Sequence, residues 1–239
     1  MLSTAEGAGV VDATGIEGVR NGYLASGMYG DSRRDFMLGV QLACKRAIDI
    51  GISASALLVL LPLLIVVACA ICAESKGSPL FNQIRWGRGN TKIRVFKFRS
   101  MRSDMCDPTG VAQTVAGDAR ITKVGAFLRK TNLDELPQLW NVLRGDMSLV
   151  GPRCHAVGML AAGVEYERLV PRYHERHLVR PGLTGLAQMR GLRGPTDRPA
   201  KARARVAADL FYIENFSILL DLRIMVGTVL SEIRGGSGF

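Results

Sequence analysis

Two adjacent carboxylates, Asp134 and Glu135, stand in a basic part of the chain, within LRKTNLDELPQLWNVLRGDMSLVGPR (residues 128–153). Arg129 and Lys130 precede them, and further arginines follow. An ionised carboxylate can attack a phosphoryl group, and neighbouring cations can bind phosphate oxygens. An Asp-Glu pair also offers the one or two carboxylates that Mg²⁺ takes in addition to substrate phosphates. The pair is therefore a candidate site for phosphoryl transfer.

Helix capping is the alternative interpretation of the same residues. With Asn132 as the N-cap, Glu135 falls at the third helical position, where it can close a capping box. Pro137 suits a first helical turn, and both acids are favoured at the positive end of the helix dipole. We expect the same dipole, together with the basic neighbours, to keep the pKa of Asp134 low. Taken alone, these residues favour capping.

Basic residues also gather ahead of the acidic pair. Between residues 85 and 130 there are eleven Lys or Arg and only three Asp. This excess of basic residues lies in a segment that is expected to form short elements and turns. Such a segment suits an anion-binding site better than the solvated face of a helix. Arginine can bind phosphate oxygens with two parallel hydrogen bonds. The candidate phosphate clamps are Lys97, Arg99, Arg129 and Arg153.

The composition narrows the class of partner. The chain has 239 residues, 31 Lys plus Arg against 21 Asp plus Glu, and 48% hydrophobic residues. Such a positive balance indicates nucleic acid, an anionic membrane or phosphorylated substrates as partners. Aromatic residues make up only 6%, few for a protein that stacks bases, which argues against nucleic acid. Five cysteines without a framework spacing predict reduced thiols on a cytosol-facing body.

Residues 50–73 form an uncharged apolar run, IGISASALLVLLPLLIVVACAICA. A straight helix of this length would measure roughly 36 Å, enough to cross a hydrocarbon core of about 30 Å. However, Pro62 stands mid-run and basic residues flank both ends. The proline predicts a bend in the helix. Because basic residues next to a membrane segment favour the cytosolic side, the basic flanks indicate that both ends lie in the cytosol. We therefore expect a re-entrant helix hairpin, with a single bent span as the alternative.

The remaining elements predict an α+β fold that is mostly helical. We expect a flexible extension over residues 1–35, a membrane helix with its flank over 36–76, and a catalytic domain over 77–239. Ile93, Val95 and Phe96 indicate a small β-hairpin around a Gly-Asn turn.

A loop should follow this hairpin at 107–122, and a short amphipathic helix at 124–130. A helix beginning near Thr196, with a break near Asn215, lies either in the membrane interface or in the core. HERH at residues 174–177 is expected to be a solvated basic segment rather than a metal site.

Several motifs, taken in order, resemble the monotopic phosphoglycosyl transferases, bacterial sugar transferases that start exopolysaccharide and glycan assembly. They begin with Lys45-Arg46 and Asp49 before the apolar run and continue with GSPLFNQIRWGRG and KFRSM. The acidic stretch, RPGLTG and DLFYIENFSILLDLRIMVGT then follow. The likeness covers about residues 45–228, and the ordered series is far more specific than any one motif.

The resemblance implies transfer of a phosphosugar from a UDP-sugar to undecaprenyl phosphate, with UMP as the second product. It further implies a Mg²⁺-dependent route through a covalent phosphosugar on Asp134, with Glu135 as metal ligand or polar assistant. Gln83 and Arg85 join the four clamps as substrate-binding residues. The expected location is the cytosolic face of the bacterial inner membrane, in contact with lipid. The oligomeric state stays open, a homodimer included, as does the sugar.

Two other functions remain as alternatives. One is a non-catalytic basic module, seated in the membrane, that binds anionic lipid or nucleic acid; it leaves the acidic motif unexplained. The other is direct phosphosugar transfer without a covalent step. Enzymes of that second kind usually have many transmembrane helices, whereas this chain has one sufficiently long apolar run.

Overall fold

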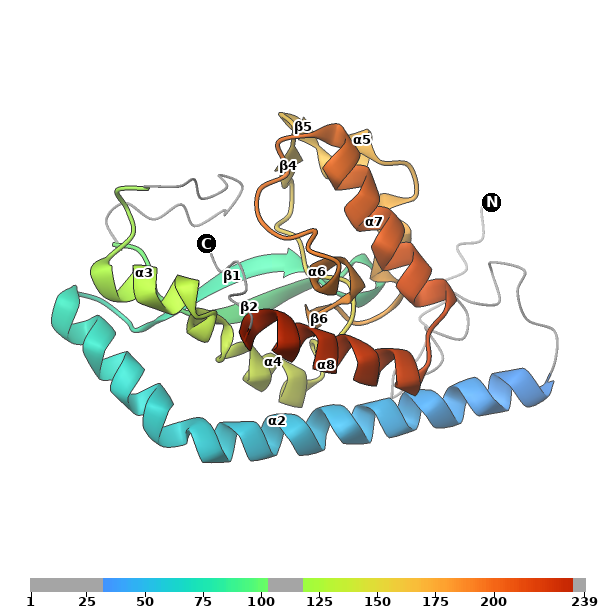
Figure 1. Cartoon of the computed structure of the whole chain (residues 1–239), viewed down its shortest axis with the longest axis horizontal. Helices are drawn as coiled ribbons and strands as arrows, with labels where there is room; N and C mark the ends of the chain where they lie inside the picture. The colour runs from blue at the N-terminus through green and yellow to red at the C-terminus, as the bar shows by residue number, and fades with distance from the viewer. Residues whose placement is uncertain (1–31, 103–117, 234–239) are drawn as a thin grey trace, which may run out of the picture. The chain divides into compact units, whose positions relative to one another are not determined.

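The computed structural model describes residues 32–102 and 118–233 (Figure 1). The chain divides into two compact units, Met1–Lys45 and Arg46–Phe239. In the first unit only a helical segment is described, and the second unit contains all other elements. Most of the predicted N-terminal extension, and most of the loop predicted at 107–122, lie outside the described residues.

The longest element is helix α2, Ser32–Glu74, which runs from the first unit into the second. Its segment Phe36–Glu74 is long and apolar enough to cross a membrane, and little of its most apolar part is buried. Pro62 lies inside the helix, where a proline removes a backbone hydrogen bond and favours a bend. The ribbon of α2 changes direction in its cyan, C-terminal part (Figure 1).

Two polar residues attach α2 to the body of the second unit just before the apolar run. Arg46 donates to the carbonyl oxygens of Val142 (2.7 Å) and Leu143 (2.9 Å). The carboxylate of Asp49, which is buried, accepts a hydrogen bond from the backbone N–H of Leu149 at 3.0 Å. Buried charged groups need such partners, so these bonds fix the start of the apolar run on the body.

The C-terminal end of α2 is attached to the same body. Glu74 accepts hydrogen bonds from the backbone N–H groups of Lys123 (2.7 Å) and Val124 (3.0 Å), at the start of α3, Lys123–Lys130. A carboxylate at a helix N-terminus satisfies donors that have no partner within the helix. Residues of α2 also enter an apolar cluster with β2 and α3, formed by Val67, Ile71, Phe98 and Leu128.

The predicted β-hairpin is confirmed. Strands β1 (Leu80–Trp86) and β2 (Lys92–Phe98) pair antiparallel, with Trp86 opposite Lys92 at the turn. A short 3-10 turn, η1 (Arg88–Asn90), joins them. Gly89 and Asn90 have positive φ angles of 64° and 59°, which these two residue types tolerate best.

The central segment contains α3, the 3-10 turn η3 (Leu133–Glu135) and helix α4 (Gln138–Arg144). The amphipathic helix predicted at 124–130 is thereby confirmed. Its N-cap is Thr122, whose side chain accepts from the backbone N–H of Gly125 at 2.9 Å.

Two short parallel strands, β3 (Ser148–Val150) and β6 (Gly182–Thr184), hold the loop that carries Arg153. Gly182 donates to the carbonyl of Pro152 at 2.9 Å, and Gly151 donates to that of Thr184 at 2.9 Å. A Cβ atom on Gly182 would lie 2.1 Å from the backbone nitrogen of Gly151. The two glycines are thus required by this close backbone approach.

Besides β6, the C-terminal half contains the small hairpin of β4 (Leu160–Ala161) and β5 (Val164–Glu165). Its other elements are α5 (Tyr166–Leu169), η4 (Tyr173–Leu178), α6 (Leu186–Met189), α7 (Pro199–Glu214) and α8 (Ile218–Ile233). The helix predicted to begin near Thr196 and to break near Asn215 is confirmed. Helix α7 buries Ala202 and Val206 in a cluster with α5 and η4, as a core helix does. Helix α8 instead exposes apolar residues, namely Leu219, Leu222, Val226, Val229 and Leu230.

The prediction that HERH is a solvated segment was wrong. It forms η4, in which Arg176 and His177 are buried. Arg176 pairs with the buried Asp209 at 2.6 Å, and His177 Nδ1 lies 2.6 Å from Asn90 Oδ1. The segment sits in the core because Asp209 supplies a countercharge from α7, about thirty residues later in the chain. The described residues contain no group of three or more His, Cys, Asp or Glu side chains placed to hold a metal.

Candidate active site

A cavity of about 630 Å³ brings the predicted site residues together. Strands β1 and β2 contribute Gln83, Arg85 and Lys97, and Arg99 follows β2. Helix α3, turn η3 and the loop after β3 add the remaining candidates. All eight candidates line this cavity: Gln83, Arg85, Lys97, Arg99, Arg129, Asp134, Glu135 and Arg153.

The local structure of the acidic pair differs from the capping box considered above. Asn132 adopts a left-handed conformation, with φ at 54°, and its side chain does not cap the following turn. It donates through Nδ2 to Glu232 Oε2 at 2.9 Å. Asp134 and Glu135 lie in a 3-10 turn, where successive side chains point about 120° apart. The two carboxylates therefore face different surroundings.

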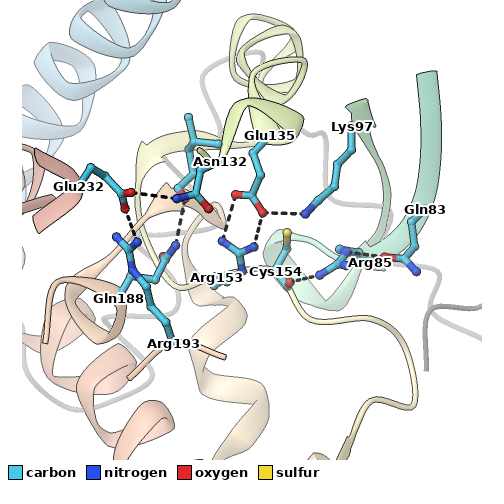
Figure 2. A network of polar contacts seen from close by, with 11 residues as sticks. Gln83, Arg85, Lys97, Asn132, Glu135, Arg153, Cys154, Gln188, Arg193 and Glu232 are labelled. Carbon is cyan, nitrogen blue, oxygen red and sulfur yellow. Dashed lines mark hydrogen bonds and ion pairs between the residues drawn. The ribbon is translucent and has the colours of Figure 1, made fainter. Parts of the chain in front are cut away.

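Glu135 forms the centre of an ion-pair network (Figure 2). Lys97 Nζ lies 2.6 Å from Glu135 Oε1, and Arg153 donates to both carboxylate oxygens, with Nη1 3.2 Å from Oε2. Burial by itself would raise the pKa of Glu135, but the charges and hydrogen bonds of Arg153 and Lys97 hold it below its usual value. Glu135 is thus an ionised anchor for two cations.

Asp134 has a contrasting environment. It is only 7% exposed, and within the described part of the chain no group donates a hydrogen bond to its carboxylate. Burial raises its pKa, against the opposing effect of the Lys97 charge. The expectation of a low pKa for Asp134 was therefore wrong, because a helix N-terminus does not solvate it and Glu135 takes the nearest cationic hydrogen bonds.

The other arginines make contacts that fix loops around the cavity. Arg85 donates to Gln83 Oε1 and to the carbonyl of Cys154, both at 2.9 Å. Arg129 Nε donates to Ser100 Oγ at 2.8 Å. Arg99 donates to backbone carbonyls directly after α2, including that of Ser75 at 2.8 Å. Its guanidinium therefore holds the chain between α2 and β1 in place.

Residues 40–235 match the family described as "Bacterial sugar transferase". This match covers well over half of the chain. The chain belongs to the bacterial sugar transferase family.

Relatives of this sugar transferase differ in length. It is 64% identical over 200 residues to the "Exopolysaccharide production protein PSS" of Rhizobium leguminosarum bv. phaseoli, which covers 84% of this chain and all of that protein. Over 191 residues it is 47% identical to the "UDP-glucose:undecaprenyl-phosphate glucose-1-phosphate transferase" of Klebsiella pneumoniae, covering 80% of this chain and 40% of that one. A protein of the same name from Caulobacter vibrioides is 48% identical over 185 residues, 77% of this chain and 68% of that one.

The cavity of the sugar transferase also contains polar residues that were not predicted to belong to the site. Asn132, Gln188, Arg193 and Glu232 line it. In Figure 2 the last three lie on the opposite side of Arg153 from Lys97 and Arg85. Gln188 and Arg193 follow the RPGLTG motif in the chain, and no role was predicted for them. Their polar side chains were the available signal.

The described cysteines, Cys44, Cys69, Cys72 and Cys154, form no disulfide bond with one another.

Proposed function

We propose that this sugar transferase moves a phosphosugar from a UDP-sugar to undecaprenyl phosphate and releases UMP, the first step of exopolysaccharide assembly. The observation that carries the proposal is the buried Asp134 carboxylate, which shares one cavity with Lys97, Arg129 and Arg153. A nucleophile and a set of cations for a diphosphate are thereby combined. The printed names of the Klebsiella and Caulobacter relatives support UDP-glucose and undecaprenyl phosphate as the substrate classes.

The reaction has two displacements at one phosphorus atom. First, a carboxylate oxygen of Asp134 attacks the phosphorus that bears the sugar; the bond to the bridging oxygen breaks, and its electron pair leaves with UMP. Next, an oxygen of undecaprenyl phosphate attacks the same phosphorus. The aspartyl P–O bond breaks, which regenerates Asp134 and gives undecaprenyl diphosphosugar. A covalent route replaces one difficult displacement by two easier ones.

Glu135 acts in this scheme through the cations that it holds. Lys97 and Arg153 are both paired with it, so they are already in place when a diphosphate enters. The planar fork of Arg153 can bind phosphate oxygens bidentately. As these cations turn toward the diphosphate, they stabilise the charge that develops during each displacement.

The acidic pair also fits a Mg²⁺ ion that the donor's diphosphate helps to hold. Such ions are usually bound by one or two carboxylates plus substrate phosphates rather than by a complete protein cage. The carboxylate of Asp134 accepts no hydrogen bond from the described residues, so its oxygens are available. Asp134 and Glu135 would hold the ion, which when bound would offset negative charge on the diphosphate.

We further propose that α2 is re-entrant and that the body lies on the cytosolic face of the inner membrane. Asp49 and Glu74 stand at the two ends of the apolar run, and both bond to the same body. A helix that crossed a core of about 30 Å would place these residues on opposite faces. The bend that Pro62 favours lets both contacts form on one face.

Labelling of single cysteines can test this topology. Cysteines at positions 34 and 76, in a background whose native cysteines are replaced, should resist an impermeant thiol reagent added to intact spheroplasts. Both should react after the membrane is made permeable. Reaction of position 34 from the periplasmic side would contradict the re-entrant topology in favour of a single span.

The covalent route is tested by omitting the acceptor. Enzyme, UDP-glucose and Mg²⁺ should release UMP up to one equivalent per enzyme, and the protein should gain the mass of one phosphosugar. Asp134→Asn keeps the size of the side chain and should lose both the adduct and turnover, by roughly 10⁴-fold or more. A panel of other UDP-sugars, assayed in the same way, identifies the preferred donor.

Two results would argue against the proposal. Turnover by the Asp134→Asn variant would exclude Asp134 as the nucleophile. Turnover by the wild-type enzyme without any adduct would favour direct transfer to the acceptor.

A further inference from the structure

The side of the cavity next to helix α8 carries a cluster of polar side chains that have no role in the proposed phosphosugar transfer. We call it the α8 side; its residues are Asn132, Gln188, Arg193 and Glu232. Asn132 and Arg193 both bond to Glu232, which stands near the C-terminal end of α8. Figure 2 shows Gln188 and Arg193 beside this carboxylate.

Two atoms on the α8 side are buried without a hydrogen-bond partner among the described residues. They are Oε1 of Gln188 and Nε of Arg193. Gln188 is only 9% exposed, and its amide nitrogen already donates to the carbonyl of Leu183 at 3.3 Å. Burial of a polar atom without a partner has a cost in stability. Such a cost at the wall of a cavity indicates a ligand that supplies the missing partners.

The loop that carries Arg193 is held by helix α7. Arg205 donates to the carbonyl oxygens of Leu192 (2.9 Å) and Gly194 (2.8 Å), on either side of Arg193. Its side chain is buried, so these bonds are sheltered from water. Arg193 is therefore fixed from both sides, as a preorganised binding group should be.

The hydrogen-bonding capacity of the two unpartnered atoms indicates which chemical group of a ligand they could bind. The unpartnered oxygen of Gln188 accepts a hydrogen bond, and Nε–H of Arg193 donates one. A phosphate oxygen can only accept, whereas a hydroxyl group can donate and accept. Glu232 would also repel a phosphate, since its carboxylate is an additional acceptor with a negative charge.

The position of the α8 side relative to Asp134 indicates which part of the UDP-sugar would bind there. Asn132, which bonds to Glu232, precedes Asp134 by two residues. Asp134 attacks the phosphorus to which the sugar is directly attached, whereas the nucleoside lies beyond the second phosphate. We infer that Gln188, Arg193 and Glu232 form a subsite for the hydroxyl groups of the donor sugar. This inference rests on the proposed function for the identity of the donor.

Binding measurements test the subsite without depending on turnover. The Asp134→Asn background prevents formation of an adduct, and Mg²⁺ is present throughout. Calorimetry gives the affinities for UDP-glucose, UDP-galactose and UDP, with and without Gln188→Leu. Gln83→Leu is the matched control, because it removes the same amide from the other side of Arg153 in the cavity (Figure 2).

Gln188→Leu should weaken the binding of the preferred UDP-sugar by about tenfold to a hundredfold, the usual effect of losing a buried hydrogen bond to a substrate hydroxyl. UDP affinity should change by less than about threefold. Discrimination between the two epimeric sugars should also decrease. Gln83→Leu should leave the ratio of UDP-sugar to UDP affinity as it is in the background.

Three outcomes would overturn the inference. An equal loss for UDP and UDP-sugar would place the nucleoside at Gln188. Unchanged affinity for every ligand would make the α8 side structural. A background protein that binds UDP-sugars no more tightly than UDP would show that no sugar subsite exists. None of these outcomes bears on the Asp134 adduct, which the wild-type mass measurement tests separately.

Discussion

The two sides of the cavity balance their charges differently. On the cationic side, Lys97 and Arg153 share one carboxylate, Glu135, and Arg85 also lines the cavity. On the α8 side, Arg193 is matched by Glu232. An excess of cations can attract and fix a diphosphate, whereas a neutral pair suits a hydroxyl-rich group.

The η3 segment joins these two sides. Asn132 bonds toward α8 and Glu135 toward the cations, with Asp134 between them in the chain. In the proposed reaction, Asp134 would therefore attack where a charged part and a neutral part of one substrate meet.

Among changes that separate the two sides of the cavity, the largest expected effect comes from removing the main cation. Arg153→Ala should lower turnover by about 10³-fold, the upper range for one preorganised charge stabiliser. Arg153→Lys should recover only part of the rate, because an ammonium group lacks the planar fork. Steady-state UMP release measures both variants. A rate near that of the wild type for Arg153→Ala would mean that the cationic side does not bind the diphosphate.

Removal of the countercharge should lower stability as well as turnover. Glu135→Gln leaves Lys97 and Arg153 without a carboxylate and should lower the free energy of unfolding by about 2 kcal/mol. This value is below the cost for a fully buried pair, because the Arg153 side chain is one-third exposed. Urea titration in detergent measures the change.

The dependence of this deficit on pH follows from the lowered pKa of Glu135. A lowered folded-state pKa gives stability that is present above the unfolded value and is lost as the pH falls toward the folded value. The deficit of Glu135→Gln should therefore shrink below about pH 4.5. Glu165→Gln, at an exposed ion pair with Arg168, is the control and should change stability little. A deficit of equal size in both variants would contradict a special role for Glu135.

A smaller effect on turnover is expected from substitution of Asn132, which connects the α8 side to the turn η3. Asn132→Ala removes the bond to Glu232 and places a less suitable residue at a positive φ angle. Asn132→Gly removes the same bond but tolerates the angle. Both should lower turnover by about tenfold if the amide positions the turn. Normal turnover of the glycine variant alone would assign the effect to backbone conformation.

The smallest predicted effect concerns Asp134 and stability. Its folded-state pKa is raised, so the folded protein binds more protons than the unfolded one, and stability falls as the pH rises above the unfolded value near 3.8. Asp134→Asn should thus raise the free energy of unfolding by on the order of 1 kcal/mol at pH 7, although activity is lost. The gain should vanish near pH 3. A loss of stability at pH 7 would contradict the unfavourable burial of this carboxylate.

Much of the fold could be predicted because its signals are local. The Gly-Asn turn between β-prone runs predicts the hairpin, and the change of pattern near Asn215 predicts the break between α7 and α8. The cationic side was also predictable, because a concentration of Lys and Arg indicates phosphate binding even when the tertiary structure is not known.

Long-range contacts explain what could not be predicted. Asn132 and Glu232 are 100 residues apart, and no local pattern connects them. The raised pKa of Asp134 arises from burial by distant elements, and Arg176 is buried because Asp209 neutralises it. A sequence pattern shows charge, whereas solvation depends on the packed structure.

The apolar cluster of Val67, Ile71, Phe98 and Leu128 has a practical consequence for protein production. Half of its members belong to α2, and Glu74 at the end of that helix caps α3. A fragment that lacks α2 and begins at residue 77 would uncover Phe98 and Leu128. It would also leave the first N–H groups of α3 without their partner. We therefore expect such a fragment to aggregate when it is expressed. The catalytic body should be purified with α2 attached, in detergent micelles or lipid nanodiscs.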